Sequence, residues 1–196
     1  MRHVLRGRQI LFARQSAGKM LKRFMLKKVP LKIGYYISGF VDGEGSFNVS
    51  LRKKSDYKNN WQVVLSFNVS QKDITLLNLI KKTLDCGIIK QRKIDKLYSL
   101  DITNPFDIAN KVIPFFDKFK LISKSKQKNY LIFKKIVDLM IKKEHLNEKG
   151  LYKIMILREK LNIGASRKRK YSINDVFGKS SETICQNRNL PTGITI

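Results

Sequence analysis

Residues 36–47 read Tyr-Ile-Ser-Gly-Phe-Val-Asp-Gly-Glu-Gly-Ser-Phe, which predicts an apolar helix that ends in a carboxylate and a glycine before a strand begins. Glycine costs helix stability relative to alanine, so two glycines in one helix indicate close approach of another element. Glu44 falls at the helix end, where a second copy of the helix would bring a second carboxylate nearby. Paired carboxylates at a helix crossing suit a hard divalent cation. The alternative is a glycine-rich helix terminus with a solvated glutamate.

Strands are predicted on the C-terminal side of this helix, which itself is expected over residues 31–43. Apolar and polar residues alternate over residues 46–54 and again over residues 61–70, with a short polar loop between them. This alternation predicts an antiparallel hairpin with one dry face and one wet face. Two shorter strands are expected over residues 88–93 and 97–102.

Helices are predicted around these hairpins. Asp73 is suited to be the N-cap of a helix over residues 74–84, and Gly87 follows it as a stop signal. Grouped hairpins with helices on one face predict an α+β domain with an antiparallel sheet. The later helices are expected over residues 105–118 (bent or shortened at Pro114), 128–143, 148–161 and 173–177, with a basic loop over residues 118–128.

The composition restricts the class of partner. The chain has 196 residues, 42% of them hydrophobic, and a formal net charge of +26. This excess of positive charge indicates a polyanionic partner, with nucleic acid as the leading candidate. An apolar run of about 18 residues, which a membrane-spanning helix would need, is absent, so no membrane partner is expected. Cys86 and Cys185 fit neither a disulfide framework nor a zinc site.

The chain divides into three predicted regions. Residues 1–30 contain nine Lys and Arg and no acid, which is typical of an organelle targeting peptide or of a basic arm that follows phosphates. Residues 31–177 are expected to form the folded domain. Residues 178–196 are polar and are expected to form a tail. A second basic run, Ala-Ser-Arg-Lys-Arg-Lys, covers residues 165–170.

The segment Ile-Ser-Gly-Phe-Val-Asp-Gly-Glu-Gly at residues 37–45, with the order of elements after it, resembles the LAGLIDADG homing endonucleases. The single copy of the motif is similar to the homodimeric branch of that family. The resemblance implies an αββαββα core with a saddle-shaped antiparallel sheet. It also implies that the motif helices of two chains pack together through Ser38, Gly39 and Gly43.

The resemblance assigns roles to individual residues. Glu44 matches the metal-binding acidic position, and the backbone carbonyl of Gly43 matches a second ligand. Gln71 matches a position that orders active-site water. The basic loop supplies a lysine near the cleaved phosphate, for which Lys126 is favoured over Lys124. The alternative for these lysines is general attraction of phosphates.

The wet face of the sheet would then contact DNA. A β-ribbon fits the major groove, where Arg or Lys reads guanine and Asn or Gln reads adenine. A solvated face without a partner is the alternative, and it explains single serines better than it explains the Lys and Arg residues. The wet-face side chains are Asn48, Ser50, Arg52 and Lys54 on the first strand, Gln62, Ser66 and Asn68 on the second, and Lys90, Arg92, Ser99 and Asp101 on the shorter pair.

The function implied by the resemblance is site-specific cleavage of both strands of double-stranded DNA, as in intron homing. Two chains would act on a long pseudo-palindromic target with Mg²⁺ as the divalent metal, leaving short 3′ overhangs. The rival is an RNA-binding protein on the same scaffold, either an intron maturase or a ribosome-associated protein, with structured RNA as its partner. The composition favours an organelle, a mitochondrion before a chloroplast, and leaves bacterial or archaeal cytoplasm open.

Overall fold

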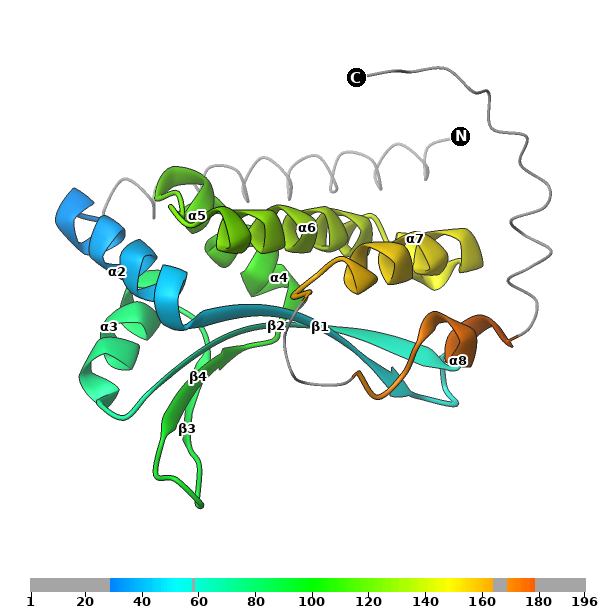
Figure 1. Ribbon diagram of the computed structural model, residues 1–196, viewed down its shortest axis with the longest axis horizontal. Coiled ribbons are helices and arrows are strands. Elements are labelled where there is room, and N and C mark those ends of the chain that lie inside the picture. Colours follow the sequence, from blue (N-terminus) through cyan, green and yellow to red (C-terminus); the bar gives the residue numbers. More distant parts are fainter. Residues whose placement is uncertain (1–28, 58, 164–168, 179–196) are drawn as a thin grey trace, which may run out of the picture.

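The protein contains a four-stranded antiparallel sheet with helices packed along one face, as the computed structural model shows (Figure 1). The structure describes residues 29–57, 59–163 and 169–178. Most of the predicted basic N-terminal region and of the C-terminal tail lies outside the described residues, as do residues 165–168 of the second basic run. Among the residues that are described, no helix has both the length and the apolar character needed to cross a bilayer.

The sheet confirms the predicted strands with small shifts of their ends. The strand order is β1-β2-β4-β3, so β1 and β3 lie at the two edges. Buried and less buried residues alternate along β1 and β2, because one face meets the core and the other does not. The strands are β1 (Gly45–Lys53), β2 (Trp61–Gln71), β3 (Ile88–Gln91) and β4 (Tyr98–Ile102).

The helices confirm the predicted order and hence the αββαββα core. The motif helix is α2 (Leu31–Glu44), and α3 (Ile74–Leu84) begins at its predicted N-cap, Asp73, whose carboxylate accepts from the backbone N–H of Thr75 at 2.8 Å. The later helical elements are α4 (Pro105–Asp107), a π-helical turn (Ile108–Val112), α5 (Ile113–Lys118), α6 (Lys124–Ile141), a 3₁₀ turn (Glu144–Leu146), α7 (Glu148–Glu159) and α8 (Ile173–Phe177).

Two predictions about the second half of the chain need correction. The predicted basic loop over residues 118–128 is wrong in its second half, because α6 begins at Lys124. Lysine is a good helix former, so a basic run does not by itself indicate a loop. Pro114 does not shorten the helix predicted over residues 105–118, because helical residues run from Pro105 to Lys118. The π-helical turn just before it leaves a continuous helical path from α4 to α5, as wider turns at such sites can do.

The core lies between the sheet and the helices and is rich in phenylalanine. The ring of Phe47 on β1 lies 5.3 Å from that of Phe67 on β2 and 5.3 Å from that of Phe133 on α6. The ring of Phe119 packs so closely against the backbone of Gly34 that no β-carbon fits there. Gly34 is therefore the position where α2 needs a glycine for packing within the chain.

Candidate functional site

The acidic end of α2 lies where the helix meets the sheet. Glu44 is the last residue of α2, and Gly45 begins β1 directly after it. The side chain of Glu44 is exposed, and so is Gly43 before it. The carboxylate of Glu44 and the carbonyl of Gly43 are therefore open to a ligand that approaches from outside the chain.

Asp42, two residues before Glu44, joins the end of α2 to the start of α6. Its carboxylate accepts from the N–H of Ile122 at 3.1 Å, from the N–H of Ser123 at 2.8 Å and from the hydroxyl of Ser123 at 2.7 Å. Ser123 is the N-cap of α6, but its own side chain caps nothing, and the first turn of α6 contains no acid. Asp42 therefore supplies from another helix the negative charge that a helix N-terminus favours.

The pKa of Asp42 reflects these contacts. Partial burial acts to raise it, but the hydrogen bonds from Ser123 and Ile122 and the charge of Lys126 outweigh burial, and the net pKa lies below its usual range. Asp42 is thus a carboxylate whose hydrogen bonds are already committed, which leaves Glu44 as the acidic group of this helix end that faces outward.

Lys126 reaches the same place from the first turn of α6. Its ammonium group donates to the backbone carbonyl of Gly45, beside Glu44. Burial lowers the pKa of Lys126, and the carboxylates of Asp42 and Glu44 oppose that shift without cancelling it. Of the two lysines considered from the sequence, the structure brings Lys126 to the acidic helix end. Lys124 lies exposed at the first position of the helix.

Gln71 ends β2 on the side of the sheet that faces the helices. Gly45 pairs with Val69 in the β1–β2 ladder, so Gln71 lies two residues beyond the partner of Gly45. Its side-chain oxygen accepts from the N–H of Lys72 at 2.8 Å. The register thus puts Gln71 at the same end of the sheet as Glu44.

The outer face of α2 contains the small residues predicted for a dimer interface, with one correction. A β-carbon built on Gly39 or Gly43 would meet nothing within 4 Å, so no described part of this chain packs there. Ser38 is wrong as an interface residue. It is 2% exposed, and its hydroxyl donates to the backbone carbonyls of Phe119 at 2.9 Å and Lys120 at 3.1 Å. Two exposed tyrosines, at positions 35 and 36, precede the open glycines along α2.

The exposed face of the sheet presents the predicted polar residues in rows across the strands. Ser46, Asn68 and Asp101 form one row, and Asn48 faces Ser66 in the next. Further along the β1–β2 hairpin, Arg52 faces Gln62, and Lys54 follows the end of β1. The strand pairing and alternation therefore support the predicted wet face, on which Ser50, Arg52 and Lys54 are exposed and Asn48, Gln62, Ser66 and Asn68 are half-buried.

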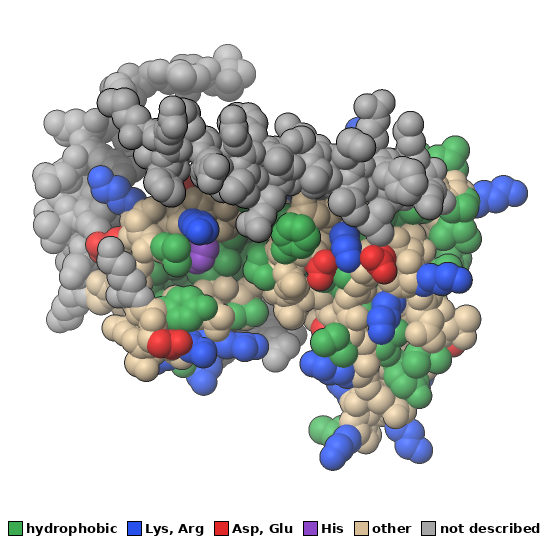
Figure 2. Space-filling model, turned by 180° about the vertical axis from the view of Figure 1, so that it is seen from behind, with side chains coloured by type: hydrophobic (Ala, Val, Ile, Leu, Met, Phe, Trp, Pro, Cys, Tyr) green, Lys and Arg blue, Asp and Glu red, His purple; other side chains and the backbone are tan. Residues whose placement is uncertain are grey.

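The shorter hairpin adds positive charge. Lys90 pairs with Ser99 on β4, and Arg92 follows the end of β3 in the turn, where it forms an exposed ion pair with Asp95 at 3.4 Å. Figure 2 shows this hairpin projecting at the lower right with Lys and Arg side chains at its tip. The basic groups are thus carried outward from the body of the domain.

Hydrogen bonds join the side chains of the wet face nearest to Glu44. The amide of Asn48 donates to Ser46 at 2.9 Å and to Asn68 at 3.2 Å. Ser66 also donates to the oxygen of Asn68, at 2.8 Å, and the amide of Asn68 donates in turn to the carboxylate of Asp101. These side chains are held in fixed orientations before any partner arrives.

Two residues after the sheet cover the outer edge of β1, and neither was predicted. Arg158, 3% exposed, donates to the carbonyl of Val49 at 3.1 Å. Asn162 donates to the carbonyl of Phe47 at 2.9 Å. Both contacts join residues more than a hundred positions apart, so no local pattern in the sequence indicates them. The contact of Asp42 with Ile122 and Ser123 is also long-range, although the position of Asp42 within the motif pointed to it.

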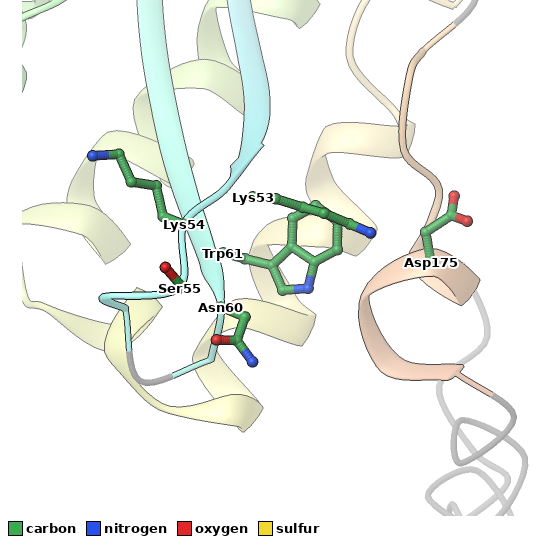
Figure 3. Close-up of a pocket in the computed structure, with 6 residues that line it drawn as sticks. All are labelled: Lys53, Lys54, Ser55, Asn60, Trp61 and Asp175. Carbon is green, nitrogen blue, oxygen red and sulfur yellow. The ribbon is translucent and has the colours of Figure 1, made fainter.

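A pocket of about 580 Å³ lies at the end of the β1–β2 hairpin away from Glu44, between the β1–β2 turn and α8 (Figure 3). Lys53 crosses the face of Trp61, with its nitrogen 5.6 Å from the ring centroid. Tyr171 packs edge-on against Trp61, with ring centroids 4.8 Å apart. Asp175 on α8 lines the same pocket as Lys53. The aromatic contact ties the segment around α8 to the ribbon.

The donor set at the end of α2 fits a hard divalent cation. It offers the exposed carboxylate of Glu44 and the carbonyl of Gly43, and oxygen ligands are those that such cations prefer. One chain offers fewer than the six ligands that such an ion takes. Within the described residues, no group of three or more His, Cys, Asp and Glu gathers to hold a metal. A complete site would need oxygens from a second chain, a phosphate or water.

Comparison with known proteins identifies the family. Residues 37–137, more than half of the chain, match the LAGLIDADG endonuclease family, and the chain belongs to it. The probable intron-encoded endonuclease 2 of Neurospora crassa is 38% identical over 135 residues, which cover 68% of this chain and 28% of that protein. The chain spans only 26–28% of the length of the first curated relatives that it matches.

Two solved structures extend this comparison. The homing endonuclease I-TnaI superposes with a TM-score of 0.63 at 33% identity, over 67% of this chain and 89% of that one. I-SmaMI, bound to uncleaved DNA in the presence of calcium ions, superposes with a TM-score of 0.63 at 39% identity, over 70% of this chain and 47% of that one. The fold of this chain is therefore that of the LAGLIDADG homing endonucleases.

Proposed function

We propose that two copies of this chain form a site-specific DNA endonuclease that cuts both strands of a long pseudo-palindromic target. The observation that carries the proposal is the meeting of Glu44 from α2 and Lys126 from α6 at one end of a polar sheet face. An acid that can hold a cation and a partly buried lysine are groups suited to phosphodiester hydrolysis. Gln71, at the same end of the sheet, would orient water.

The open face of α2 supports the two-chain assembly. Gly39 and Gly43 have space above them, so a second α2 could approach closely. A two-fold axis between the helices would bring two Glu44 carboxylates and two Gly43 carbonyls together. The match of this chain to about half of I-SmaMI, and to most of I-TnaI, fits a chain that provides one of two similar halves. The two-fold symmetry would be mirrored in the target.

Each group at the proposed site would have a separate chemical role. Glu44 and Gly43 would hold Mg²⁺, which supplies water activation and stabilises the leaving oxygen when bound. Lys126 would place positive charge beside the phosphate, and its lowered pKa makes it a readier proton donor than an exposed lysine. The sheet face would lie in the major groove, and the basic hairpin tip would contact phosphates, which set affinity without selecting sequence.

The setting that we propose is intron homing in an organelle, with a mitochondrion favoured. Several relatives are named as intron-encoded, among them a protein in ND4 intron 1 of Podospora anserina and one in cox1 intron 2 of Schizosaccharomyces pombe. These names support a mobile intron as the gene's context, and the high positive charge fits a nucleic-acid partner.

The experiment is cleavage of genomic DNA from a relative that lacks the intron, with Mg²⁺, followed by sequencing of the DNA ends. We expect discrete double-strand ends with short 3′ overhangs from the wild type and none from Glu44→Gln, which should still bind DNA. Glu148→Gln makes the same change at an exposed site at the start of α7 and should cut normally. Cutting by Glu44→Gln would refute the assigned role. Tight binding without discrete ends, and RNA copurifying with the protein, would favour the RNA-binding alternative.

A further inference from the structure

Asn162 lies just after α7 and reaches around the edge of β1 to the polar face of the sheet. Its backbone is left-handed, with φ of 54°, a conformation that Asn adopts more readily than most residues. Its N–H donates to the side-chain oxygen of Asn129 on α6 at 2.9 Å. Its side-chain nitrogen donates to the carbonyl of Phe47 at 2.9 Å and to the oxygen of Asn48 at 3.1 Å.

These partners fix which way the amide of Asn162 points. The backbone carbonyl of Phe47 only accepts hydrogen bonds, so the group that faces it must be the NH₂ of Asn162. That NH₂ has two hydrogens, and the second is directed at Asn48. The atom of Asn48 that receives it must then be the oxygen. The orientation of Asn48 follows from hydrogen-bond chemistry and does not depend on telling N from O in an amide.

The orientation passes along the sheet face. With its oxygen held by Asn162, Asn48 presents its NH₂ to Ser46 and to the oxygen of Asn68. Asn68 then directs its own NH₂ at the carboxylate of Asp101. The hydrogens are therefore donated in one direction, from the NH₂ of Asn162 through Asn48 and Asn68 to the carboxylate of Asp101, which only accepts and so fixes the same orientation from the other end. This direction decides which atoms of Asn48 and Asn68 remain for an incoming base.

We propose that Asn162 is a positioning residue for sequence specificity, which holds Asn48 and, with Asp101 at the other end of the chain of bonds, fixes how Asn48 and Asn68 present donors and acceptors to the DNA bases. The inference rests on the proposed function, because it takes the polar sheet face as the surface that reads DNA. The rows that contain Asn48 and Asn68 lie at the Glu44 end of β1, whereas Arg52 and Gln62 pair near its other end. Asn162 thus governs the base pairs nearest to the cut.

The test compares the base preferences of full-length wild type and Asn162→Gly, obtained by selection from a pool of random duplex DNA with Ca²⁺. Glycine keeps the left-handed backbone and removes only the amide. We expect discrimination at the base pairs nearest to the cut to fall about tenfold, within the range of one side-chain contact to a base, with outer positions unchanged. Asn60→Gly is the matched control, because Asn60 is also left-handed, with φ of 56°, and lies outside the chain of bonds.

The free protein provides a second readout, through the side-chain amide signals of Asn48 and Asn68 in NMR spectra. These signals should shift and exchange faster with water in Asn162→Gly and stay unchanged in Asn60→Gly. An identical base profile for wild type and Asn162→Gly would overturn the assignment alone. Failure of the wild type to enrich any sequence would overturn the proposed DNA reading and this assignment with it.

Discussion

Replacing Asp42 with alanine separates the two helices that form the acidic site. The change removes the acceptor for the N–H groups of Ile122 and Ser123 and for the hydroxyl of Ser123. The start of α6 then loses the carboxylate that accepts from the backbone N–H and the hydroxyl of its N-cap, Ser123. Since Lys126 lies in the first turn of α6, its ammonium should move away from Gly45 and Glu44.

The expected cost in folding free energy follows from the exposure of the donors. Losing a helix-start acceptor costs about 0.5–2 kcal/mol, and a hydrogen bond to a charged group is worth about 1.5–3 kcal/mol. Ile122 is 82% exposed, so water can replace part of what Asp42 provides. We therefore expect Asp42→Ala to lower the free energy of unfolding by about 1.5 kcal/mol, which lowers Tm by roughly 3–6 °C in a protein of this size.

The assay measures the cleavage rate and the thermal stability of Asp42→Ala beside those of Asp73→Ala. Asp73 makes the same kind of contact at the start of α3, away from Glu44 and Lys126. Both variants should lose stability, but only Asp42→Ala should lose cleavage, by about a hundredfold if Lys126 is displaced from the phosphate. Equal cleavage by the two variants at a temperature where both are folded would refute the reasoning.

The pH dependence of stability provides an independent check. The folded-state pKa of Asp42 lies below its unfolded value of about 3.9, so its contribution is present above that pH. The contribution is lost as pH falls from the unfolded-state pKa through the folded-state pKa, because over that range the unfolded state binds a proton that the folded state does not. The stability gap between wild type and Asp42→Asn should therefore be constant near neutral pH and close below pH about 3.9. A gap that widens in acid would contradict this sign.

Three further predictions test other parts of the site. Lys126→Met should lower the cleavage rate about a hundredfold with DNA affinity unchanged. Lys135→Met, at an exposed position on the same helix, should cut normally. Equal cleavage rates for the two variants would exclude a catalytic role for Lys126. Gly39→Ala should stabilise the isolated protomer by about 0.8 kcal/mol in thermal unfolding, because nothing described lies above Gly39. The same change should weaken self-association in sedimentation. A less stable protomer would contradict the open space above Gly39. Arg158→Met should lower the free energy of unfolding by about 2–3 kcal/mol in urea, because the carbonyl of Val49 loses its donor, and an unchanged midpoint would show that water replaces it.

Much of the fold could be predicted because its local signals agree with its tertiary structure. The alternation from Phe47 to Leu51 and from Trp61 to Val69 reflects one face against the core, so a period of two was visible without the partner strand. Asp73 was a reliable N-cap because the bond that it makes reaches only two residues along the chain. Patterns that depend on residues this close along the chain can be recognised in a single sequence.

The parts that could not be predicted depend on long-range contacts. The start of α6 was misplaced because the side chain that completes it, Asp42, lies 81 positions before Ser123. Ser38 was assigned to an interface because small residues suit helix contacts, but its hydroxyl is held by backbone carbonyls of Phe119 and Lys120 within the chain. The resemblance favoured Lys126 over Lys124, but the contact of Lys126 with the carbonyl of Gly45, 81 positions earlier, shows only in the structure.

The covered edge of β1 has a consequence for incomplete chains. An uncovered strand edge of nine residues would expose a row of peptide groups that can pair with any other extended chain. In the intact domain Arg158 donates a hydrogen bond to the carbonyl of Val49, and Asn162 donates one to the carbonyl of Phe47. A product that stopped before residue 158 would retain the whole sheet but lose both covering side chains. We expect such fragments to aggregate edge to edge, which makes the end of α7 a determinant of solubility.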